Sequence, residues 1–178
     1  SKFLKKPILK NIKIKTISTD TRSLKKDSLF IAIKGDTFNG NDYIAEAIKK
    51  GACLVITDSK KFKYSKNKKV IYVNDSILAL KKITKNIIKH YQGNVIGITG
   101  SNGKTTTTRI IANSIKNSSS TLKNFNNEIG MPLSIMNADP KKKNLIIEMF
   151  DTPLMKWAAI ECFKDFLSCQ NKLDENFM

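Results

Sequence analysis

The chain has 178 residues, 40% of them hydrophobic, and a formal net charge of +17; this length allows one domain or two small ones with a real core. No stretch approaches the roughly 18 consecutive apolar residues of a membrane-spanning helix, so membrane insertion is not expected. All basic residues except Arg22 and Arg109 are lysines, and the arginine clusters and interleaved aromatic residues that read or stack on bases are absent, so we expect a lysine-rich surface, with some attraction for anionic small substrates, and no nucleic-acid partner.

The cysteine content and the N-terminus bear on the cellular compartment. Three cysteines without a CxxC pair favour reduced thiols over a disulfide framework or a zinc site. The N-terminal lysines are not followed by an apolar signal core, which predicts a cytoplasmic protein without an export signal. Because the chain opens on Ser1 and not on methionine, we expect the first residues of the natural protein to be missing.

Strands alternate with helices along the chain. The alternation of apolar and polar residues over 12–18 predicts a weak strand. Apolar runs predict four buried strands, at residues 29–33, 52–57, 70–73 and 145–147. This alternation indicates an α/β protein with largely parallel sheets.

Two helices are expected in the first half of the chain. The first begins at Asn41 or Asp42, either of which can cap it, and runs to about Lys50, with Gly51 as its stop. The second covers 76–91, where apolar residues recur at helical spacing. A solvated lysine-rich link separates two of the strands between these helices.

The most informative segment has the sequence VIGITGSNGKTT and starts at Val95. It is a short apolar strand, a glycine-bearing turn and the start of a helix, which together direct backbone N–H groups and a helix N-terminus at a phosphate. Gly100 and Gly103 let the backbone close round a polyphosphate. Lys104 can reach the terminal phosphates, and the Thr105 hydroxyl can ligate a magnesium ion.

Other candidate features are less specific. Ile98 stands where the general P-loop pattern has a glycine, which makes the loop a variant. Glu148 ends an apolar strand, where a carboxylate can complete a magnesium site, although a surface glutamate is an equal alternative. The amides of 124–133 suit hydrogen bonding to a substrate, but an Asn-rich turn explains them as well. A Ser-rich turn is expected before Thr121, and His90, which has no Ser or Cys partner at a recognisable spacing, is interpreted as a residue of a helix terminus.

A resemblance to a known family rests on several of these segments. The loop from Gly97 to Thr107 resembles the ATP loop of the Mur ligases, which build the peptide of bacterial cell-wall precursors. Four upstream stretches resemble the UDP-binding N-terminal domain of that family: 18–23, 27–35, 38–44 and 47–52. The resemblance covers about residues 15–149 and implies a small N-terminal α/β domain followed by a parallel-sheet P-loop domain.

The segment NFNNEIGMPL at 124–133 is most similar to family members that add D-alanyl-D-alanine to UDP-N-acetylmuramoyl-tripeptide. The implied reaction is ATP-dependent amide formation, in which the tripeptide carboxylate takes the γ-phosphoryl group and the acyl phosphate is attacked by the D-alanyl-D-alanine amine. The alternatives are a member that adds the third residue to the UDP-linked dipeptide, or a non-catalytic nucleotide-binding module. A monomer is expected.

The resemblance also implies a set of site residues. Lys104 is the implied catalytic residue, because it neutralises charge on the transferred phosphoryl group. The implied ATP-binding residues are Gly100, Ser101, Asn102, Gly103, Lys104, Thr105 and Thr106. The implied Mg²⁺ ligands are Thr105 and Glu148. The implied contacts with the UDP-N-acetylmuramoyl-peptide are Asp20, Thr21, Arg22, Phe38, Asn39 and Gly40, with Asn126 and Asn127 facing the reaction centre.

Three segments follow from these patterns. We expect a UDP-substrate-binding domain at 1–84, the start of an incomplete ATP-binding central domain at 85–150, and an unassigned tail at 151–178. Net charge changes from +19 over residues 1–150 to −2 over residues 151–178. The resemblance ends at the same place, so a frameshift or truncation is expected. The tail could still form a helix capped by Thr152. We expect the chain alone not to catalyse the ligation.

Overall fold

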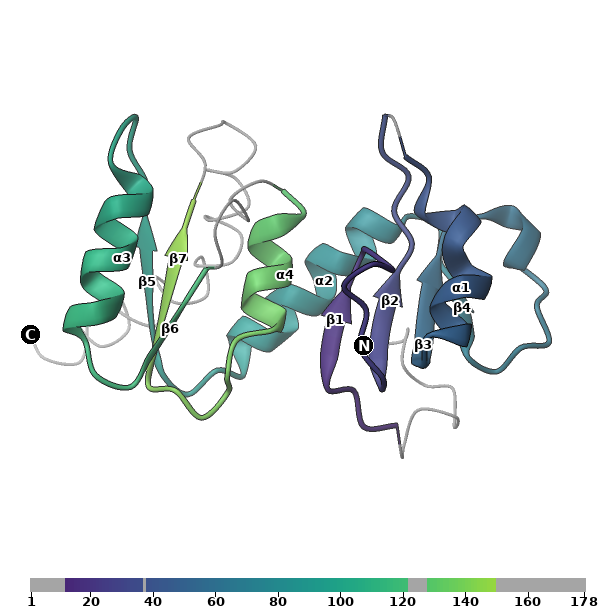
Figure 1. Cartoon of the computed structure of the whole chain (residues 1–178), viewed down its shortest axis with the longest axis horizontal. Helices are drawn as coiled ribbons and strands as arrows, with labels where there is room; N and C mark the ends of the chain where they lie inside the picture. The colour runs from purple at the N-terminus through teal and green to yellow at the C-terminus, as the bar shows by residue number, and fades with distance from the viewer. Residues whose placement is uncertain (1–11, 37, 122–127, 150–178) are drawn as a thin grey trace, which may run out of the picture. The chain divides into compact units, whose positions relative to one another are not determined.

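The computed structural model describes residues 12–36, 38–121 and 128–149. The chain divides into two compact units, an N-terminal unit ending at Leu80 and a C-terminal unit beginning at Lys81 (Figure 1). This division lies four residues before the boundary expected at 84/85. Both units are α/β, and every strand pairing in their two sheets is parallel, as the sequence predicts.

The N-terminal unit contains a four-stranded sheet of order β1-β2-β3-β4. Its strands are β1 (Thr16–Ser18), β2 (Ser28–Ile31), β3 (Ala52–Thr57) and β4 (Val70–Tyr72). All of β2 and nearly all of β3 are buried, in agreement with their continuous apolar sequence. The predicted strand 52–57 is confirmed at both ends.

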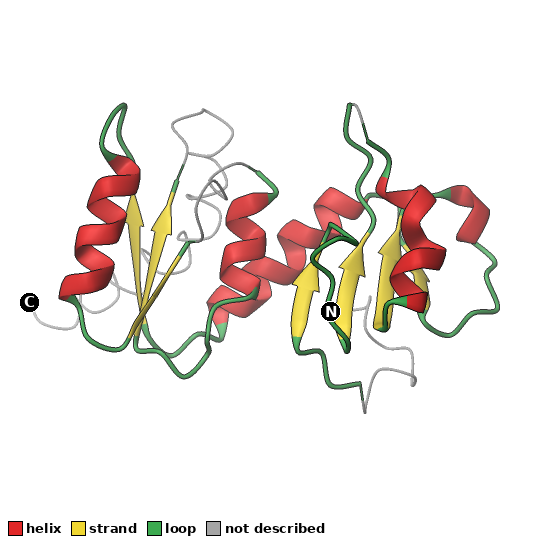
Figure 2. Ribbon diagram, in the orientation of Figure 1, coloured by secondary structure: helices red, strands yellow, loops and turns green. Residues whose placement is uncertain are grey.

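Among the described residues, three short helices and the beginning of a longer one complete this unit (Figure 2). They are the 3₁₀ helices η3 (Gly40–Tyr43) and η4 (Lys60–Phe62), the helix α1 (Ile44–Lys49), and the start of α2 (Ser76–Lys89). Ile44 and Ala47 of α1 join the buried cluster around Phe30 and Val55 of the sheet. Gly51 follows α1 with a φ of 98°, which confirms it as the stop.

The expected cap of the first helix is wrong. Helical structure begins at Gly40, and its N-cap is Asn39, whose side chain accepts a hydrogen bond from the backbone N–H of Asn41. Glycine is needed at position 40, because a Cβ there would lie 2.8 Å from the backbone N and O of Ile33. Helical backbone therefore starts one residue before the two capping candidates, Asn41 and Asp42.

The helix expected over 76–91 is confirmed as α2 and is two residues shorter. Asp75 caps it by accepting a hydrogen bond of 2.8 Å from the N–H of Leu78. His90 follows the last helical residue, with its Nδ1 2.8 Å from the carbonyl oxygen of Asn86. This contact agrees with the interpretation of His90 as a residue of the helix terminus.

The C-terminal unit contains a three-stranded sheet of order β5-β7-β6. Its elements after α2 are β5 (Asn94–Ile98), α3 (Lys104–Ser114), β6 (Ser118–Ser120), α4 (Gly130–Met136) and β7 (Asn144–Glu148). Met131 and Ile135 of α4 form a buried cluster with Leu145 and Ile147 of β7 (Figure 1).

Two elements of this unit differ from expectation. The serine run before Thr121 is strand β6 and not a turn, because it pairs with β7 in register from Ser118 to Ser120; tertiary pairing here overrides the weak strand propensity of serine. The segment 130–136 is helix α4, in which Pro132 occupies the first turn, where its missing N–H has no helical partner to lose.

Within the described part of the chain, no helix combines the length and the apolar character needed to cross a membrane. The tail from residue 150 onward, including the helix expected after Thr152, lies outside the described residues.

Candidate functional site

The turn between β5 and α3 has the shape expected of a phosphate-binding loop. Gly100 and Gly103 have φ values of 145° and 74°, in the region that favours glycine. Gly103 is also the N-cap of α3 and accepts a hydrogen bond of 2.9 Å from the N–H of Thr107. Ile98, at the position where the general pattern has glycine, is buried at the end of β5 and accepts a hydrogen bond from the N–H of Met149. The variant loop thus begins only after the strand has ended.

The side chain of Lys104 folds back over this loop. Its ammonium group donates to the carbonyl oxygen of Gly100 and, at 3.5 Å, to that of Ser101. Ser101 and Asn102 themselves are exposed on the turn, and Thr106 is exposed on the first turn of α3. The predicted ATP residues therefore lie together on one loop and one helix start.

Glu148 contacts Thr105, although 43 residues separate them along the chain. The hydroxyl of Thr105 donates to Oε1 of Glu148 at 2.8 Å. The contact exists because the β5–β7 register places Glu148 beside Ile98, where both strands end at the loop. The carboxylate is 6% exposed, so it is a built feature of the site and not a surface glutamate.

The backbone of Glu148 is held by a residue that the sequence did not suggest. Its N–H donates to the hydroxyl oxygen of Thr121 at 3.1 Å, and the N–H of Thr121 donates to the carbonyl oxygen of Ile146. Thr121 thus continues the pairing of β6 with β7 by one side-chain hydrogen bond. No signal marks it in the sequence, since the serine strand before it lacks apolar residues.

These residues fit a nucleotide with magnesium. A hydroxyl and a carboxylate in contact at a helix N-terminus are hard oxygen ligands of the kind Mg²⁺ takes beside a phosphate. Among the residues that the structure describes, no group of three or more His, Cys, Asp or Glu side chains could hold a metal. A magnesium ion bound to Thr105 and Glu148 would therefore complete its coordination with phosphate oxygens and water.

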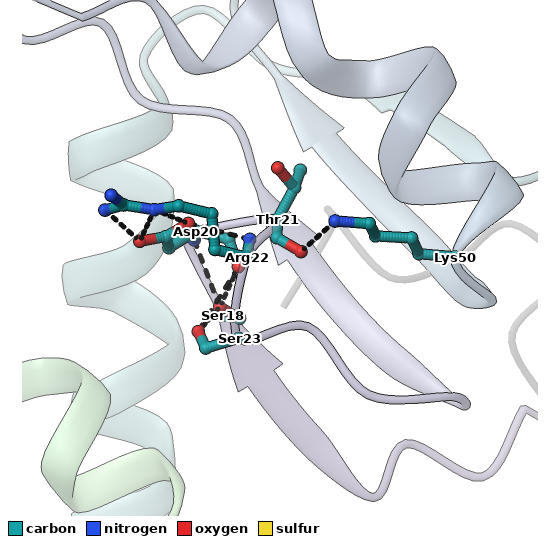
Figure 3. Close-up of polar contacts among 6 residues, drawn as sticks. All are labelled: Ser18, Asp20, Thr21, Arg22, Ser23 and Lys50. Carbon is teal, nitrogen blue, oxygen red and sulfur yellow. Dashed lines mark hydrogen bonds and ion pairs between the residues drawn. The ribbon is translucent and has the colours of Figure 1, made fainter.

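The predicted UDP-binding residues after β1 lie in a hydrogen-bonded turn (Figure 3). The guanidinium of Arg22 is bidentate on Asp20, with Nε 3.0 Å from both carboxylate oxygens and Nη2 2.6 Å from Oδ2. This hydrogen bond lowers the pKa of the Asp20 carboxyl below its usual value. Thr21 is buried, and its carbonyl oxygen accepts a hydrogen bond of 3.0 Å from the ammonium of Lys50. The side chain of Arg22 is 88% exposed, so the turn presents it to solvent.

The second predicted set lies after β2. The ring of Phe38 is 46% exposed and stacks on Tyr43, with ring centroids 4.6 Å apart. Asn39 caps η3, and Gly40 turns against Ile33 as described above. The two sets share the carboxyl edge of neighbouring parallel strands, the usual place of ligands in such sheets.

The pKa of Arg22 is raised, chiefly by its hydrogen bond to Asp20 and in smaller part by Tyr43. Because β1 and β2 are neighbouring parallel strands, the six predicted UDP residues lie at one edge of the sheet. Asn126 and Asn127, predicted to face the reaction centre, lie outside the described residues.

Sequence comparisons agree with this geometry. Residues 13–94 match the family described as "Mur ligase family, catalytic domain", and residues 98–161 match the "Mur ligase middle domain". The second match extends twelve residues beyond 149, where the resemblance seen in the sequence ends.

Individual relatives point to two kinds of ligase. The chain is 36% identical over 142 residues to the UDP-N-acetylmuramoyl-tripeptide--D-alanyl-D-alanine ligase of Synechocystis sp., covering 78% of this chain and 31% of that enzyme. It is 40% identical over 105 residues to the UDP-N-acetylmuramoyl-L-alanyl-D-glutamate--2,6-diaminopimelate ligase of Rickettsia prowazekii, covering 59% of this chain and 22% of that enzyme.

A solved structure gives the same result. The MurF ligase of Thermotoga maritima, determined in complex with ADP, superposes with a TM-score of 0.73 and 29% identity over 86% of this chain and 36% of that one. The chain thus spans about a third of the length of the Synechocystis and Thermotoga maritima enzymes and about a fifth of the Rickettsia prowazekii enzyme. Its phosphate loop, its two parallel sheets and both sequence matches lead to one conclusion: the chain belongs to the Mur ligase family.

Proposed function

We propose that this chain is part of an ATP-dependent ligase of peptidoglycan precursor synthesis that adds D-alanyl-D-alanine to UDP-N-acetylmuramoyl-tripeptide. The observation that carries the nucleotide-dependent part is the contact of Thr105 with Glu148 beside the glycine loop. The choice of substrate is supported by the similarity to the D-alanyl-D-alanine-adding enzymes, which extends over 142 residues.

Each residue of the glycine loop has a role in this proposal. The backbone N–H groups from Gly100 to Thr106 hold the phosphates of ATP, and Lys104 exchanges its carbonyl partners for phosphate oxygens. Thr105 and Glu148 hold Mg²⁺. When bound, ATP and Mg²⁺ supply the phosphoryl group that activates a carboxylate and the charge that stabilises its transfer. The protein contributes mainly orientation, through the fixed relation of the loop to β7.

The N-terminal unit holds the UDP end of the substrate in this proposal. Asp20 fixes Arg22 so that its exposed guanidinium can donate to diphosphate oxygens. Thr21 fixes the same turn through its contact with Lys50. Phe38, Asn39 and Gly40 supply the second wall, and Asn126 and Asn127 face the reaction centre.

A second candidate is a ligase that adds the third residue to the UDP-linked dipeptide. The 40% identity to the Rickettsia prowazekii enzyme favours it, but over the shorter span of 105 residues. Competition between UDP-N-acetylmuramoyl-dipeptide and -tripeptide for binding separates the two candidates. Preferential binding of the tripeptide supports the first, and preferential binding of the dipeptide overturns it.

We also propose that these 178 residues do not complete the ligation alone, since they span 31% of the Synechocystis relative. Purified chain should bind ATP with Mg²⁺ in calorimetry yet give no product from ATP, D-alanyl-D-alanine and the UDP-linked tripeptide. Product formation would overturn this part, and an absence of ATP binding would overturn the nucleotide site. A cytoplasmic location is proposed as well, supported by three cysteines without a CxxC pair, and the chain is proposed to be a monomer.

A further inference from the structure

A polar network joins three distant segments at the carboxyl edge of the N-terminal sheet. Asn41 donates from Nδ2 to Oδ1 of Asp58 at 3.1 Å, and its Oδ1 accepts a hydrogen bond of 2.6 Å from the hydroxyl of Thr57. The second carboxylate oxygen of Asp58 lies 3.4 Å from the N–H of Ser76, at the start of α2. The network therefore ties the loop after β2 to the end of β3 and to the helix that follows β4.

The amide of Asn41 is occupied by protein partners. Its Nδ2 also donates to Oδ1 of Asn39 at 3.0 Å, so both of its N–H groups have acceptors. Thr57 is fully buried, and its hydroxyl oxygen accepts a further hydrogen bond of 3.1 Å from the N–H of Ser59. A side chain engaged in this way holds a loop in place and has little capacity left for a ligand.

We infer that Thr57 and Asp58 are positioning residues that fix the loop 38–42 in its binding conformation by holding Asn41. The inference rests on the proposed function, in which Phe38, Asn39 and Gly40 of that loop contact the UDP end of the substrate. Asn41 links β3 to this loop. Its side chain accepts the hydrogen bond from Thr57, its backbone N–H donates to the cap Asn39, and it follows Gly40, which packs closely on Ile33. Without the network, the loop must be ordered by the ligand, and that ordering lowers affinity.

Four single variants of the purified chain test this inference, with UDP as the probe in isothermal titration calorimetry. Thr57→Val keeps the shape of the side chain and removes the hydroxyl, whereas Thr57→Ser keeps the hydroxyl. Asp58→Asn replaces one carboxylate oxygen by an NH₂ group, so only one of the two donors, Nδ2 of Asn41 or the N–H of Ser76, keeps its acceptor. Asp27→Asn is the matched control, because this carboxylate precedes β2 at the opposite edge of the sheet and pairs with Lys15.

We expect Thr57→Val and Asp58→Asn to bind UDP about tenfold more weakly, in line with one lost buried hydrogen bond. Thr57→Ser and Asp27→Asn should stay within about twofold of the unchanged chain, since each leaves the network in place. Hydrogen exchange gives a second readout that needs no ligand. The amides of Gly40 and Asp42, which donate to Ile33 and Asn39, should exchange faster in the two weakened variants while those of β3 keep their protection.

The outcomes separate the inference from the function on which it rests. If the unchanged chain binds UDP and both weakened variants bind it equally well, the positioning role is overturned and the UDP site stands. The positioning role is likewise overturned if the melting temperature falls while UDP affinity and loop exchange do not change, since that describes a structural role only. If the unchanged chain does not bind UDP, the proposed substrate site fails, and the positioning role fails with it.

Discussion

Lys104 holds a positive charge at the opening of the glycine loop, where its ammonium rests on two backbone carbonyls of the loop. Replacing it with alanine removes the charge and leaves the backbone of α3 intact, because alanine is a strong helix former. We expect Lys104→Ala to weaken Mg-ATP binding by about 10- to 100-fold, the size of a lost charged hydrogen bond. Calorimetry measures this. Lys116→Ala, with the same charge change in the turn after α3, should bind like the unchanged chain.

Glu148 leads to a different prediction, because the role proposed for it concerns the metal ion and not the phosphates. Glu148→Gln retains an oxygen that can accept from Thr105 but removes the negative charge. The gain in ATP affinity on adding Mg²⁺ should shrink by about tenfold or more, while binding in EDTA stays unchanged. Asp139→Asn, in the turn before β7, is the matched control. An unaltered magnesium effect in Glu148→Gln would exclude this carboxylate as a ligand.

The spacing of residues predicts some of these groups and not others. Lys104 and Thr105 follow from the glycine pattern, and Glu148 from its place at the end of an apolar strand. Thr121, Thr57 and Asp58 make side-chain hydrogen bonds to segments that are distant in sequence. Such contacts have no period and no flanking signal, so only the fold reveals them.

Among the elements, the turn into η3 depends on one residue without a side chain. A Cβ on Gly40 would meet the backbone of Ile33 at 2.8 Å, and backbone atoms cannot move aside as a flexible side chain can. We expect Gly40→Ala to lower the free energy of unfolding by about 1–3 kcal/mol, the usual cost of overpacking. Gly35→Ala, whose Cβ would lie at an ordinary 3.4 Å from the carbonyl oxygen of Phe38, is the control.

Urea denaturation followed by circular dichroism measures both variants. Equal stability of Gly40→Ala and Gly35→Ala would show that the loop can shift away from Ile33. Hydrogen exchange at Gly40 then locates any loss of stability, because its N–H donates to the carbonyl oxygen of Ile33, two residues beyond the end of β2.

Elements with a strong apolar pattern are the ones that the sequence predicts. β3 is confirmed at both ends and α2 nearly so, because burial of one continuous run or one helical face determines each. β6 and α4 escape prediction for opposite reasons. The serines of β6 form a strand because β7 lies beside them, and α4 is only seven residues long and begins with a glycine.

At the scale of the whole molecule, net charge makes a prediction that no single residue makes. A charge of +17 raises the local concentration of anionic ligands, and salt screens this attraction over a Debye length of about 10 Å at 0.1 M. UDP affinity should therefore fall several-fold between about 0.02 and 0.5 M salt. Uridine, which is uncharged, provides the control. If the affinities of UDP and uridine fell equally with salt, salt would be acting on the protein itself and not on its attraction for the charged ligand.

The sequence predicts a domain boundary at 84/85, whereas the packing divides the chain after Leu80. The change from one sheet to the next occurs within α2, a continuous helix of 14 residues whose apolar spacing does not change along its length. A boundary inside a regular element leaves no shift in composition to detect. The resemblance to the family supplies the order of the units, and the division at Leu80 comes from the packing.

The order β5-β7-β6 gives β5 a single ladder partner within the described ranges. Asn94 and Ile98 bond toward β7, so the backbone groups of Val95 and Gly97, which alternate with them, point to the other side. An open strand edge is a template on which a further polypeptide segment can pair. The strand that ends in the glycine loop is thus one of the two edges, with that of β6, at which the described sheet can be extended. A strand added along β5 would lie beside the turn that we propose holds the nucleotide.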